Sequence, residues 1–224
     1  MSDDREKLQE KAYEQLRSAI LFSRHQPGER LQVKELCEEL DMGRTPVREA
    51  LLRLQQDGLI ETVPQSGTYV SKIDLHAAEC SRFVREQLEQ EIYVECCAKA
   101  KDDDVSRLEG IIDHARTAKQ EHDQLSFFEN DNLFHEALFV IADREEVWGW
   151  VNSISTDLDR YRWLRILTEG LAWETIIDQH ERIVDAIRNR QPSEARYLAS
   201  RHLHMMFDER AQVIDSHASF FLGE

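Results

Sequence analysis

The stretch RTPVREALLRLQQDGLI, residues 44–60, decides the fold of the first part of the chain. It predicts a helix with Thr45, a residue type that caps helix N-termini, at its start and Pro46 at the first helical position. Its apolar side chains recur every three or four residues and form one stripe: Val47, Ala50, Leu51 and Leu54. The pair Asp57-Gly58 ends the pattern, so one short amphipathic helix is expected here.

The residues on either side of this helix complete a recognisable arrangement. Upstream, apolar spacing predicts helices over about residues 7–24 and 33–40, and residues 41–43 form a tight turn. Downstream, residues 59–63 and 68–71 are rich in Ile, Val, Thr and Tyr, and a short turn joins them as a hairpin. Two helices that meet at a three-residue turn, followed by a hairpin, are typical of a winged helix-turn-helix.

After Ile73 the strand patterns stop and helical patterns follow. They cover six segments, at about residues 75–101, 103–121, 125–142, 145–167, 172–190 and 193–220. The expected fold class is therefore mainly α: a winged helix-turn-helix of three helices and a β-hairpin, followed by an all-α bundle. We expect one domain over residues 1–72 and a second, dimer-forming domain over residues 73–224.

Charge is divided unequally between these two parts. The 224-residue chain has a net charge of −16. Residues 1–72 carry 11 Lys and Arg against 13 Asp and Glu, whereas residues 73–224 carry 17 against 31. The two parts are electrostatically different, which indicates different roles.

Composition excludes several protein classes. With 41% hydrophobic and 32% charged residues, the chain has a globular composition. We expect no transmembrane helix, because the apolar runs are short, and no signal peptide, because the start of the chain is acidic. The four cysteines form no C-x-x-C pair, which favours reduced thiols and a cytoplasmic location.

Basic residues at the start of the 44–60 helix indicate DNA binding. Arg44 and Arg48 occupy a position where the helix dipole favours acidic side chains, and an opposing phosphate or guanine edge would explain them. Lys34 is expected to touch the DNA backbone, and Gly67 to let the hairpin approach the minor groove. The alternative is a three-helix domain with solvated arginines.

Four motifs span nearly all of the first 72 residues: Pro27-Gly28-x-x-Leu31, Leu36-x-x-x-Leu40, Arg44-Thr45-Pro46-Val47-Arg48-Glu49-Ala50-Leu51-x-x-Leu54-x-x-x-Gly58-Leu59-Ile60 and Gly67-x-x-Val70. Together they resemble the GntR family of bacterial repressors. One departure is Gly43, where that family usually has Ser or Thr. The resemblance implies that the DNA-contacting positions are Lys34, Arg44, Thr45, Arg48 and Gly67.

In the second part, three histidines and an aspartate are predicted on buried helix faces. Asp131 and His135 are four residues apart and share one face with apolar residues. His180 and His202 lie in the apolar stripes of two other helices, whereas His204 should face solvent. One such histidine is usually a satisfied core residue. Three with a carboxylate instead suit Zn²⁺, Ni²⁺, Mn²⁺ or Fe²⁺, with open positions for a ligand oxygen.

Arg85 is expected on the buried face of the first bundle helix. Two roles remain open for it: a bidentate clamp on a ligand carboxylate, or an ordinary ion pair with Glu89 one helical turn later. Arg162 and Arg165 fall near the apolar edge of their helix and are secondary candidates for a ligand contact.

Four features of the second part occur together: Arg85-x-x-x-Glu89, Asp131-x-x-x-His135, His180-x-x-Ile183-x-x-Ala186-Ile187, and the stretch from Ala195 through His202-Leu203. Over residues 75–218 they resemble the FCD ligand-binding domain of the FadR subfamily of GntR regulators. The resemblance implies a divalent metal, zinc first, and a small carboxylate or sugar-acid effector that touches the metal. It implies Arg85 as effector-binding residue and the following metal ligands: Asp131, His135, His180 and His202.

Three functions are compatible with these features. The first is a transcriptional regulator, not an enzyme, that binds double-stranded operator DNA as a homodimer, since operators are commonly palindromic. The second is an all-α metalloenzyme with a DNA-binding appendage. The third is an effector-independent DNA binder whose metal only braces the bundle. We expect the first, because the sequence offers no convincing general base beside the predicted metal ligands.

Overall fold

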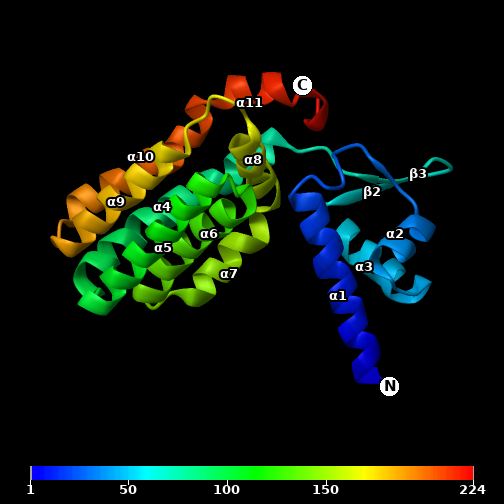
Figure 1. Cartoon of the computed structure of the whole chain (residues 1–224), viewed down its shortest axis with the longest axis horizontal. Helices are drawn as coiled ribbons and strands as arrows, with labels where there is room; N and C mark the ends of the chain where they lie inside the picture. Colours follow the sequence, from blue (N-terminus) through cyan, green and yellow to red (C-terminus); the bar gives the residue numbers. More distant parts are fainter. Residues whose placement is uncertain (1, 224) are drawn as a thin grey trace. The chain divides into compact units, whose positions relative to one another are not determined.

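The chain forms two compact units, drawn as ribbons in Figure 1. The computed structural model describes the backbone of residues 2–223 and, apart from residues 2–5, 206 and 207, their side chains. One unit extends to Leu75 and also includes the segment from His217 onward, and the other spans His76–Ser216. No described helix has both the length and the hydrophobicity that a membrane crossing requires.

Helices and a small sheet make up the first unit. Its elements are α1 (Ser2–Leu21), β1 (Arg30–Leu31), α2 (Val33–Leu40), α3 (Arg44–Gln56), β2 (Ile60–Val63) and β3 (Gly67–Val70). The strands pair antiparallel in the order β1-β3-β2, with Ile60 opposite Val70 and Arg30 opposite Tyr69. The predicted winged helix-turn-helix is confirmed. The two-residue β1 is an addition, too short to leave an alternating pattern in the sequence.

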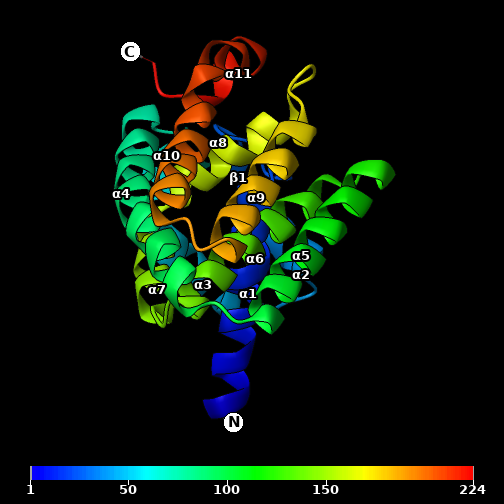
Figure 2. The ribbon, with the colours of Figure 1, turned by 90° about the vertical axis from the view of Figure 1, so that its left-hand side faces the viewer.

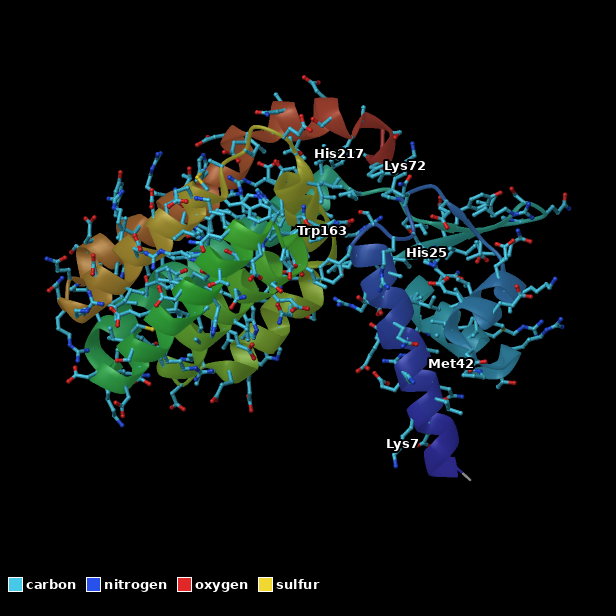
Figure 3. All side chains as sticks on the ribbon, in the orientation of Figure 1. Lys7, His25, Met42, Lys72, Trp163 and His217 are labelled. Carbon is cyan, nitrogen blue, oxygen red and sulfur yellow. The ribbon has the colours of Figure 1, made fainter. Side chains whose placement is uncertain are left out.

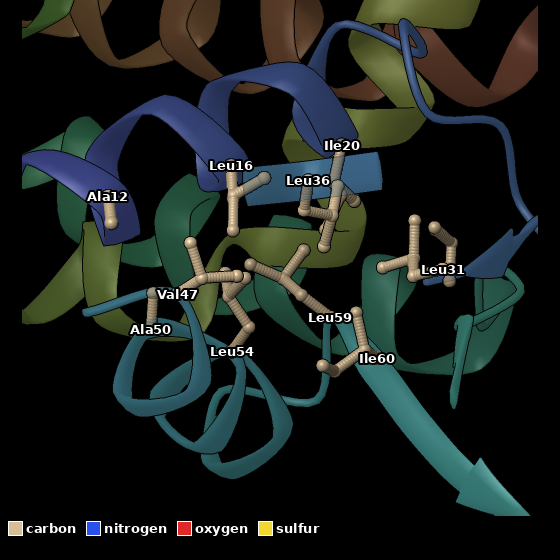
Figure 4. Packing of buried hydrophobic residues seen from close by; sticks show 11 residues of the cluster. Ala12, Leu16, Ile20, Leu31, Leu36, Val47, Ala50, Leu54, Leu59 and Ile60 are labelled. Atoms are coloured by element: carbon tan, nitrogen blue, oxygen red, sulfur yellow. The ribbon is translucent and has the colours of Figure 1, made fainter. Parts of the chain in front are cut away.

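A contiguous apolar core fixes α3 against α1 and the wing (Figure 4). Leu16 of α1 and Val47 and Leu54 of α3 are at most 1% exposed, and Leu59, which leads into β2, is fully buried. Each such side chain contributes about 1.5–3 kcal/mol on burial. Because this stripe faces inward, the opposite, polar face of α3 is held outward in a fixed orientation.

The structure corrects the predicted start of α3. The residue at the N-cap is Gly43, in an extended conformation and without a side-chain cap, so Thr45 lies inside the first turn. The tight turn before it is made by Asp41, which adopts the left-handed conformation (φ 51°). Because no cap side chain satisfies them, the first amides of α3 remain available to an external anion.

The second unit is all-helical, as predicted. Its helices are α4 (Leu75–Lys99), α5 (Asp102–Glu121), α6 (Gln124–Ile141), α7 (Glu145–Ile154), α8 (Thr156–Leu167), α9 (Trp173–Arg188), α10 (Pro192–Asp208) and α11 (Arg210–Ser216). Helix α5 packs against α6 and α9, and α9 packs against α10. Figures 1 and 2 show these helices side by side. The sides of these helices that face one another form the interior of the bundle.

The helix predicted over residues 145–167 is interrupted at Ser155, which separates α7 from α8. The buried hydroxyl of Ser155 donates a hydrogen bond to the carbonyl of Val151 (2.6 Å). Such local bonds compete with helical backbone pairing and bend the chain. The apolar period continues through the bend, which is why periodicity alone predicted one helix.

The helix predicted over residues 193–220 is also shorter than expected. It ends at Asp208, and Glu209 separates α10 from α11. The carboxylate of Glu209 pairs with the guanidinium of Arg165 on α8 (2.5 Å). This interhelical ion pair fixes the position of the junction, and no local sequence pattern encodes it.

The end of the described chain belongs to the first unit. After a short 3₁₀ helix (Ala218–Phe220), Phe221 forms a parallel bridge with Ile73. The amide of Ile73 donates to the carbonyl of Phe220 (2.9 Å), and the amide of Leu222 donates to the carbonyl of Ile73 (3.0 Å). The segment that follows the wing is therefore held by backbone hydrogen bonds from the C-terminal segment.

Candidate functional site

Four side chains from three helices of the second unit meet at one point. Asp131 and His135 lie one turn apart on α6, His180 lies on α9 and His202 on α10, and one ligand-type atom from each lies within 4.8 Å of the others. The Nε2 atom of His202 is 3.2 Å from that of His135 and 3.3 Å from that of His180. The structure therefore brings together the four residues that the sequence predicts as metal ligands.

Hydrogen bonds on the far side of two rings fix which nitrogen faces the centre. The Glu89 carboxylate binds Nδ1 of His135 (2.7 Å), and the side-chain oxygen of Gln179 binds Nδ1 of His202 (2.7 Å). Because both oxygens are acceptors, each Nδ1 carries the proton and each Nε2 presents a lone pair. Two lone pairs thus face each other across 3.2 Å, an arrangement that a shared cation would stabilise.

The spacing and protonation of the donors fit a divalent metal. Nitrogen ligands lie about 2.0–2.1 Å from zinc, so at the tetrahedral angle two of them are about 3.3–3.4 Å apart, close to the 3.3 and 3.2 Å between the Nε2 atoms. Burial lowers the pKa of His180 to about 3 and holds the pKa values of His135 and His202 below their usual value. The imidazoles are therefore neutral at pH 7, the form that binds metals.

Asp131 is oriented by an arginine. One of its carboxylate oxygens accepts a hydrogen bond from Nη2 of Arg162, and Nη1 of the same arginine donates to Asp159 (2.7 Å). The other oxygen, Oδ1, lies 3.4 Å from Nε2 of His180. Burial would raise the pKa of Asp131, but the Arg162 guanidinium more than offsets it, so its pKa lies well below the usual range. Asp131 thus presents an ionised oxygen to the cluster.

Arg85 on α4 is fully buried and combines features of both predicted roles. Its Nε donates to the Glu89 carboxylate (2.5 Å), the ion pair expected from the i, i+4 spacing. Its Nη2, however, is buried and has no hydrogen-bond partner in the part of the chain that the structure describes. The effector role of Arg85 stays a prediction, and Nη2 is the atom available for it.

A small cavity with about 30 Å³ of free space adjoins the cluster. Its wall includes Arg162 and Arg165 as well as Arg85, so both secondary candidates lie where a ligand would bind. Both are on α8, together with Trp163, which is labelled in Figure 3. The wall is formed by Arg85, Phe127, Asp131, His135, Arg162, Arg165, Ile166, Ile176, His202, Leu203 and Met205.

Sequence reasoning missed two supporting residues, Tyr93 and Gln179, and the bond from Glu89 to His135. Glu89 is buried completely and links Arg85 to His135. The hydroxyl of Tyr93 donates to the same carboxylate (2.6 Å), and Gln179 holds His202. The spacing of Arg85, Glu89 and Tyr93, one turn apart on one face, was a usable signal. Nothing in the sequence pairs Gln179 with His202, which is 23 residues away.

In the first unit, four of the five predicted DNA-contacting residues are exposed, and the fifth, Gly67, is half-buried. Arg44, Thr45 and Arg48 project from the start of α3, whose first turn contains no acidic residue. Lys34 on α2 is 80% exposed, with Glu38 3.8 Å away. Arg44, Thr45 and Arg48 lie in the first two turns of α3, beside its uncapped amides, so this end of the helix has the donors and the positive charge that a phosphate backbone requires.

The wing adds a residue that the sequence analysis did not single out. Gly67 begins β3 at φ 148°, a conformation that favours glycine, and a Cβ there would lie 2.8 Å from Nε of Arg30. The Arg30 guanidinium therefore rests on the bare backbone of Gly67. This contact places a further positive charge at the wing, because β1 pairs with β3.

Comparison with known proteins identifies both units. Residues 8–70 match "Bacterial regulatory proteins, gntR family", and residues 82–205 match the FCD domain. The chain is 31% identical over 197 residues to an uncharacterized HTH-type transcriptional regulator of Streptomyces ambofaciens, a match that covers 88% of this chain and 82% of the relative. This chain belongs to the GntR family and carries an FCD domain.

Other known proteins match nearly the whole chain. The HTH-type transcriptional repressor RspR of Escherichia coli (strain K12) is 27% identical over 217 residues, which cover 97% of this chain and 95% of the relative. The solved structure of E. coli McbR/YncC shares the fold, with a TM-score of 0.76 at 18% identity over 94% of this chain and 98% of that one. The family and its named members are transcriptional regulators, which sets the metalloenzyme alternative aside.

Replacing one clustered histidine should reduce metal binding selectively. We expect His180→Ala to weaken metal affinity about 100-fold or more, because removing even a residue that supports a ligand costs about 10–100-fold. His204→Ala is the matched control, since His204 is exposed on α10. Elemental analysis after dialysis against a competing chelator measures both. Equal metal loss from the two variants would contradict the assignment.

Proposed function

We propose that this GntR regulator acts in the cytoplasm and binds operator DNA with an affinity that a small carboxylate or sugar acid controls from a metal centre in the FCD domain. One observation carries the proposal. Neutral imidazoles and an ionised carboxylate converge beside a cavity lined by a fully buried arginine, Arg85, whose Nη2 has no hydrogen-bond partner among the described residues.

Asp131, His135, His180 and His202 would hold the metal. Zinc suits this nitrogen and oxygen set best, with nickel, manganese and iron as alternatives. When bound, the metal supplies a Lewis acid that attracts an anionic oxygen of the effector. The protein's own contribution is to fix the ligand atoms, through Glu89, Gln179 and Arg162, and to keep the imidazoles neutral by burying them.

The effector's carboxylate would bind between this centre and Arg85. Glu89 already holds Arg85 through Nε, which leaves Nη2 as a charge-assisted donor. The apolar residues of the wall, such as Phe127 and Leu203, lower the local dielectric and so strengthen that contact. The alternative of a metal that only braces the bundle leaves this donor unexplained.

DNA would be bound by α3 and the wing. Arg44, Thr45 and Arg48 would enter the major groove, with Lys34 on the backbone and Gly67 at the minor groove. This placement is supported by the exposed arginines at the start of α3, by the inward-facing apolar stripe of that helix and by the match of residues 8–70 to the GntR family.

A homodimer matches the two-fold symmetry of palindromic operators. Two large apolar side chains of the FCD domain support it: Phe83 on α4 is 57% exposed and Trp150 on α7 is 66% exposed. Helices α4 and α7 are joined by a hydrogen bond from Ser81 to the Ile154 carbonyl (2.5 Å) and lie along the same edge of the domain in Figure 2. Exposed aromatic residues of this kind often anchor interfaces.

Effector control would then be a shift between two arrangements of the dimer. An effector that binds one arrangement more tightly by about 1–3 kcal/mol changes operator affinity about 5–150-fold. One or two charge-assisted hydrogen bonds are enough to provide a binding free-energy difference of this size.

Arg48→Ala should weaken operator binding by about 1–3 kcal/mol if Arg48 reads a guanine, with metal content and fold unchanged. The matched control is Arg24→Ala, an exposed arginine of the same unit outside α3. Fluorescence anisotropy with operator fragments selected from a random library measures both. If the Arg48 variant binds the operator fragments with unchanged affinity at every salt concentration, the assignment of α3 as the recognition helix is wrong.

Arg85→Gln should abolish the effector response without releasing metal, because glutamine can still bond to Glu89 but lacks the charged Nη2 donor. A thermal-shift and operator-release screen of small organic acids on metal-loaded protein supplies the test. A normal effector response in this variant would mean that Arg85 only forms a structural ion pair with Glu89. If no acid alters the melting temperature or the operator affinity of the wild type, the effector-independent alternative holds.

Trp150→Asp should raise the dimer dissociation constant about 30-fold or more, the loss typical of an interface hot spot. Tyr197→Asp is the control, since Tyr197 on α10 is 55% exposed but lies outside α4 and α7. Sedimentation velocity over a concentration series gives both constants. Equal behaviour of the two variants would place the dimer contact elsewhere.

A further inference from the structure

A large apolar side chain lies in the middle of the polar face of α3. Leu52 is 56% exposed. It follows Thr45 by seven residues and Arg48 by four, which places it about 20° and about 40° from them around the helix axis. The apolar stripe that includes Val47 and Leu54 faces the core instead. Leu52 therefore shares the outward face with two residues that are proposed to enter the major groove.

A single exposed leucine on a protein surface needs no explanation, but the surroundings of Leu52 are specific. Leu52 and Arg48 line the same groove between α3 and the wing. The next residue, Arg53, is turned toward α1, where it donates to Glu10 (2.6 Å) and its guanidinium lies over the ring of Tyr13 (3.8 Å to the ring centroid). Leu52 is therefore open to solvent directly beside Arg48.

On the other side of Leu52, the wing fixes a polar side chain. Thr62 of β2 donates a hydrogen bond to Oε1 of Gln55 (3.1 Å), which lies about one turn after Leu52 on α3. Because this bond holds the Gln55 amide against the wing, the amide leaves Leu52 exposed. The groove is lined by Arg48, Leu51, Leu52, Gln55, Ile60, Thr62 and Thr68. Among these described residues Arg48 alone is charged.

The major groove of DNA offers one kind of apolar group to a side chain in this position. Its base edges present hydrogen-bond donors and acceptors, and the exception is the C5 methyl group of thymine. A leucine that covers a donor or acceptor leaves it without a partner, which costs affinity. A leucine that covers a methyl group instead removes apolar surface of both from water. The side chain of Leu52 therefore favours thymine over the other three bases.

We propose that Leu52 determines operator specificity by packing against the C5 methyl group of a thymine. This inference rests on the proposed function, because it requires α3 in the major groove, and it adds one base of the operator and the residue that selects it. Four helical residues span about 6 Å, and successive base pairs are about 3.4 Å apart. The thymine is therefore expected within about two base pairs of the position that Arg48 contacts.

Replacement of single thymines by deoxyuridine tests the proposal, because deoxyuridine lacks only the methyl group and keeps the pairing edge. The full chain is titrated against an operator fragment selected from a random library, and fluorescence anisotropy gives the affinity for each replacement. In the wild type, one replacement should weaken binding about fourfold, which corresponds to about 0.8 kcal/mol for one buried methyl-sized group.

In Leu52→Ala the same replacement should make no difference, and the thymine-containing operator should bind about fourfold or more weakly than it binds the wild type. Alanine leaves the core intact, because Leu52 is exposed. Leu8→Ala is the matched control, since Leu8 on α1 of the same unit is 47% exposed, and it should keep the thymine preference. Leu52→Met retains an apolar contact and should keep part of it.

Two further readouts separate base reading from a general effect on affinity. Selection from the random library with Leu52→Ala should return sequences in which that thymine is no longer preferred. The ratio of the affinities for thymine and deoxyuridine should also be the same at every salt concentration, because a contact with a neutral methyl group releases no counterions.

Three outcomes contradict the inference in distinguishable ways. If no deoxyuridine replacement weakens binding of the wild type, Leu52 reads no methyl group, although operator binding stands. If the loss at one thymine persists in Leu52→Ala, another residue reads that methyl group. If the library yields no preferred sequence for the wild type, the proposed operator binding fails and this inference fails with it.

Discussion

The structure depends on two buried imidazole nitrogens that face each other with lone pairs. Glu89 and Gln179 fix the protons of His135 and His202 on the outer nitrogens, and the inner Nε2 atoms are then 3.2 Å apart with no proton between them. The lone pairs of two neutral rings in this arrangement repel each other, whereas a divalent cation between them would bind both Nε2 atoms. Helices α6, α9 and α10 are therefore best held together when a metal is bound.

The charges around this centre form one connected arrangement. Glu89 joins His135 to Arg85, and Arg162 joins Asp131 to α8. Each buried carboxylate has a cationic neighbour, as buried charges require, but the guanidinium groups of Arg85 and Arg165 keep N–H groups that no described residue uses. Positive charge is therefore left over in the interior of the FCD domain, and both arginines line the cavity.

Helical periodicity in the sequence predicted which side chains share a buried helix face, both in the His and Asp cluster and in α3. Asp131 and His135 share a face because they are four residues apart, and the apolar stripe of α3 set the orientation of its basic face in the same way. The breaks at Ser155 and Glu209 were missed because a hydroxyl and an interhelical ion pair cause them without changing the apolar period. The bond between Glu89 and His135 spans 46 residues, and local spacing holds no information about such a partner.

X-ray absorption spectroscopy of the purified, metal-loaded protein tests the central claim most directly, because it reports the atoms around the metal without a crystal. The account predicts three imidazole nitrogens and a carboxylate oxygen at about 2.0–2.2 Å, and a change in the oxygen shell when a carboxylate effector is added. A sulfur shell at about 2.3 Å from the cysteines, or a spectrum with fewer than two imidazoles, would contradict it.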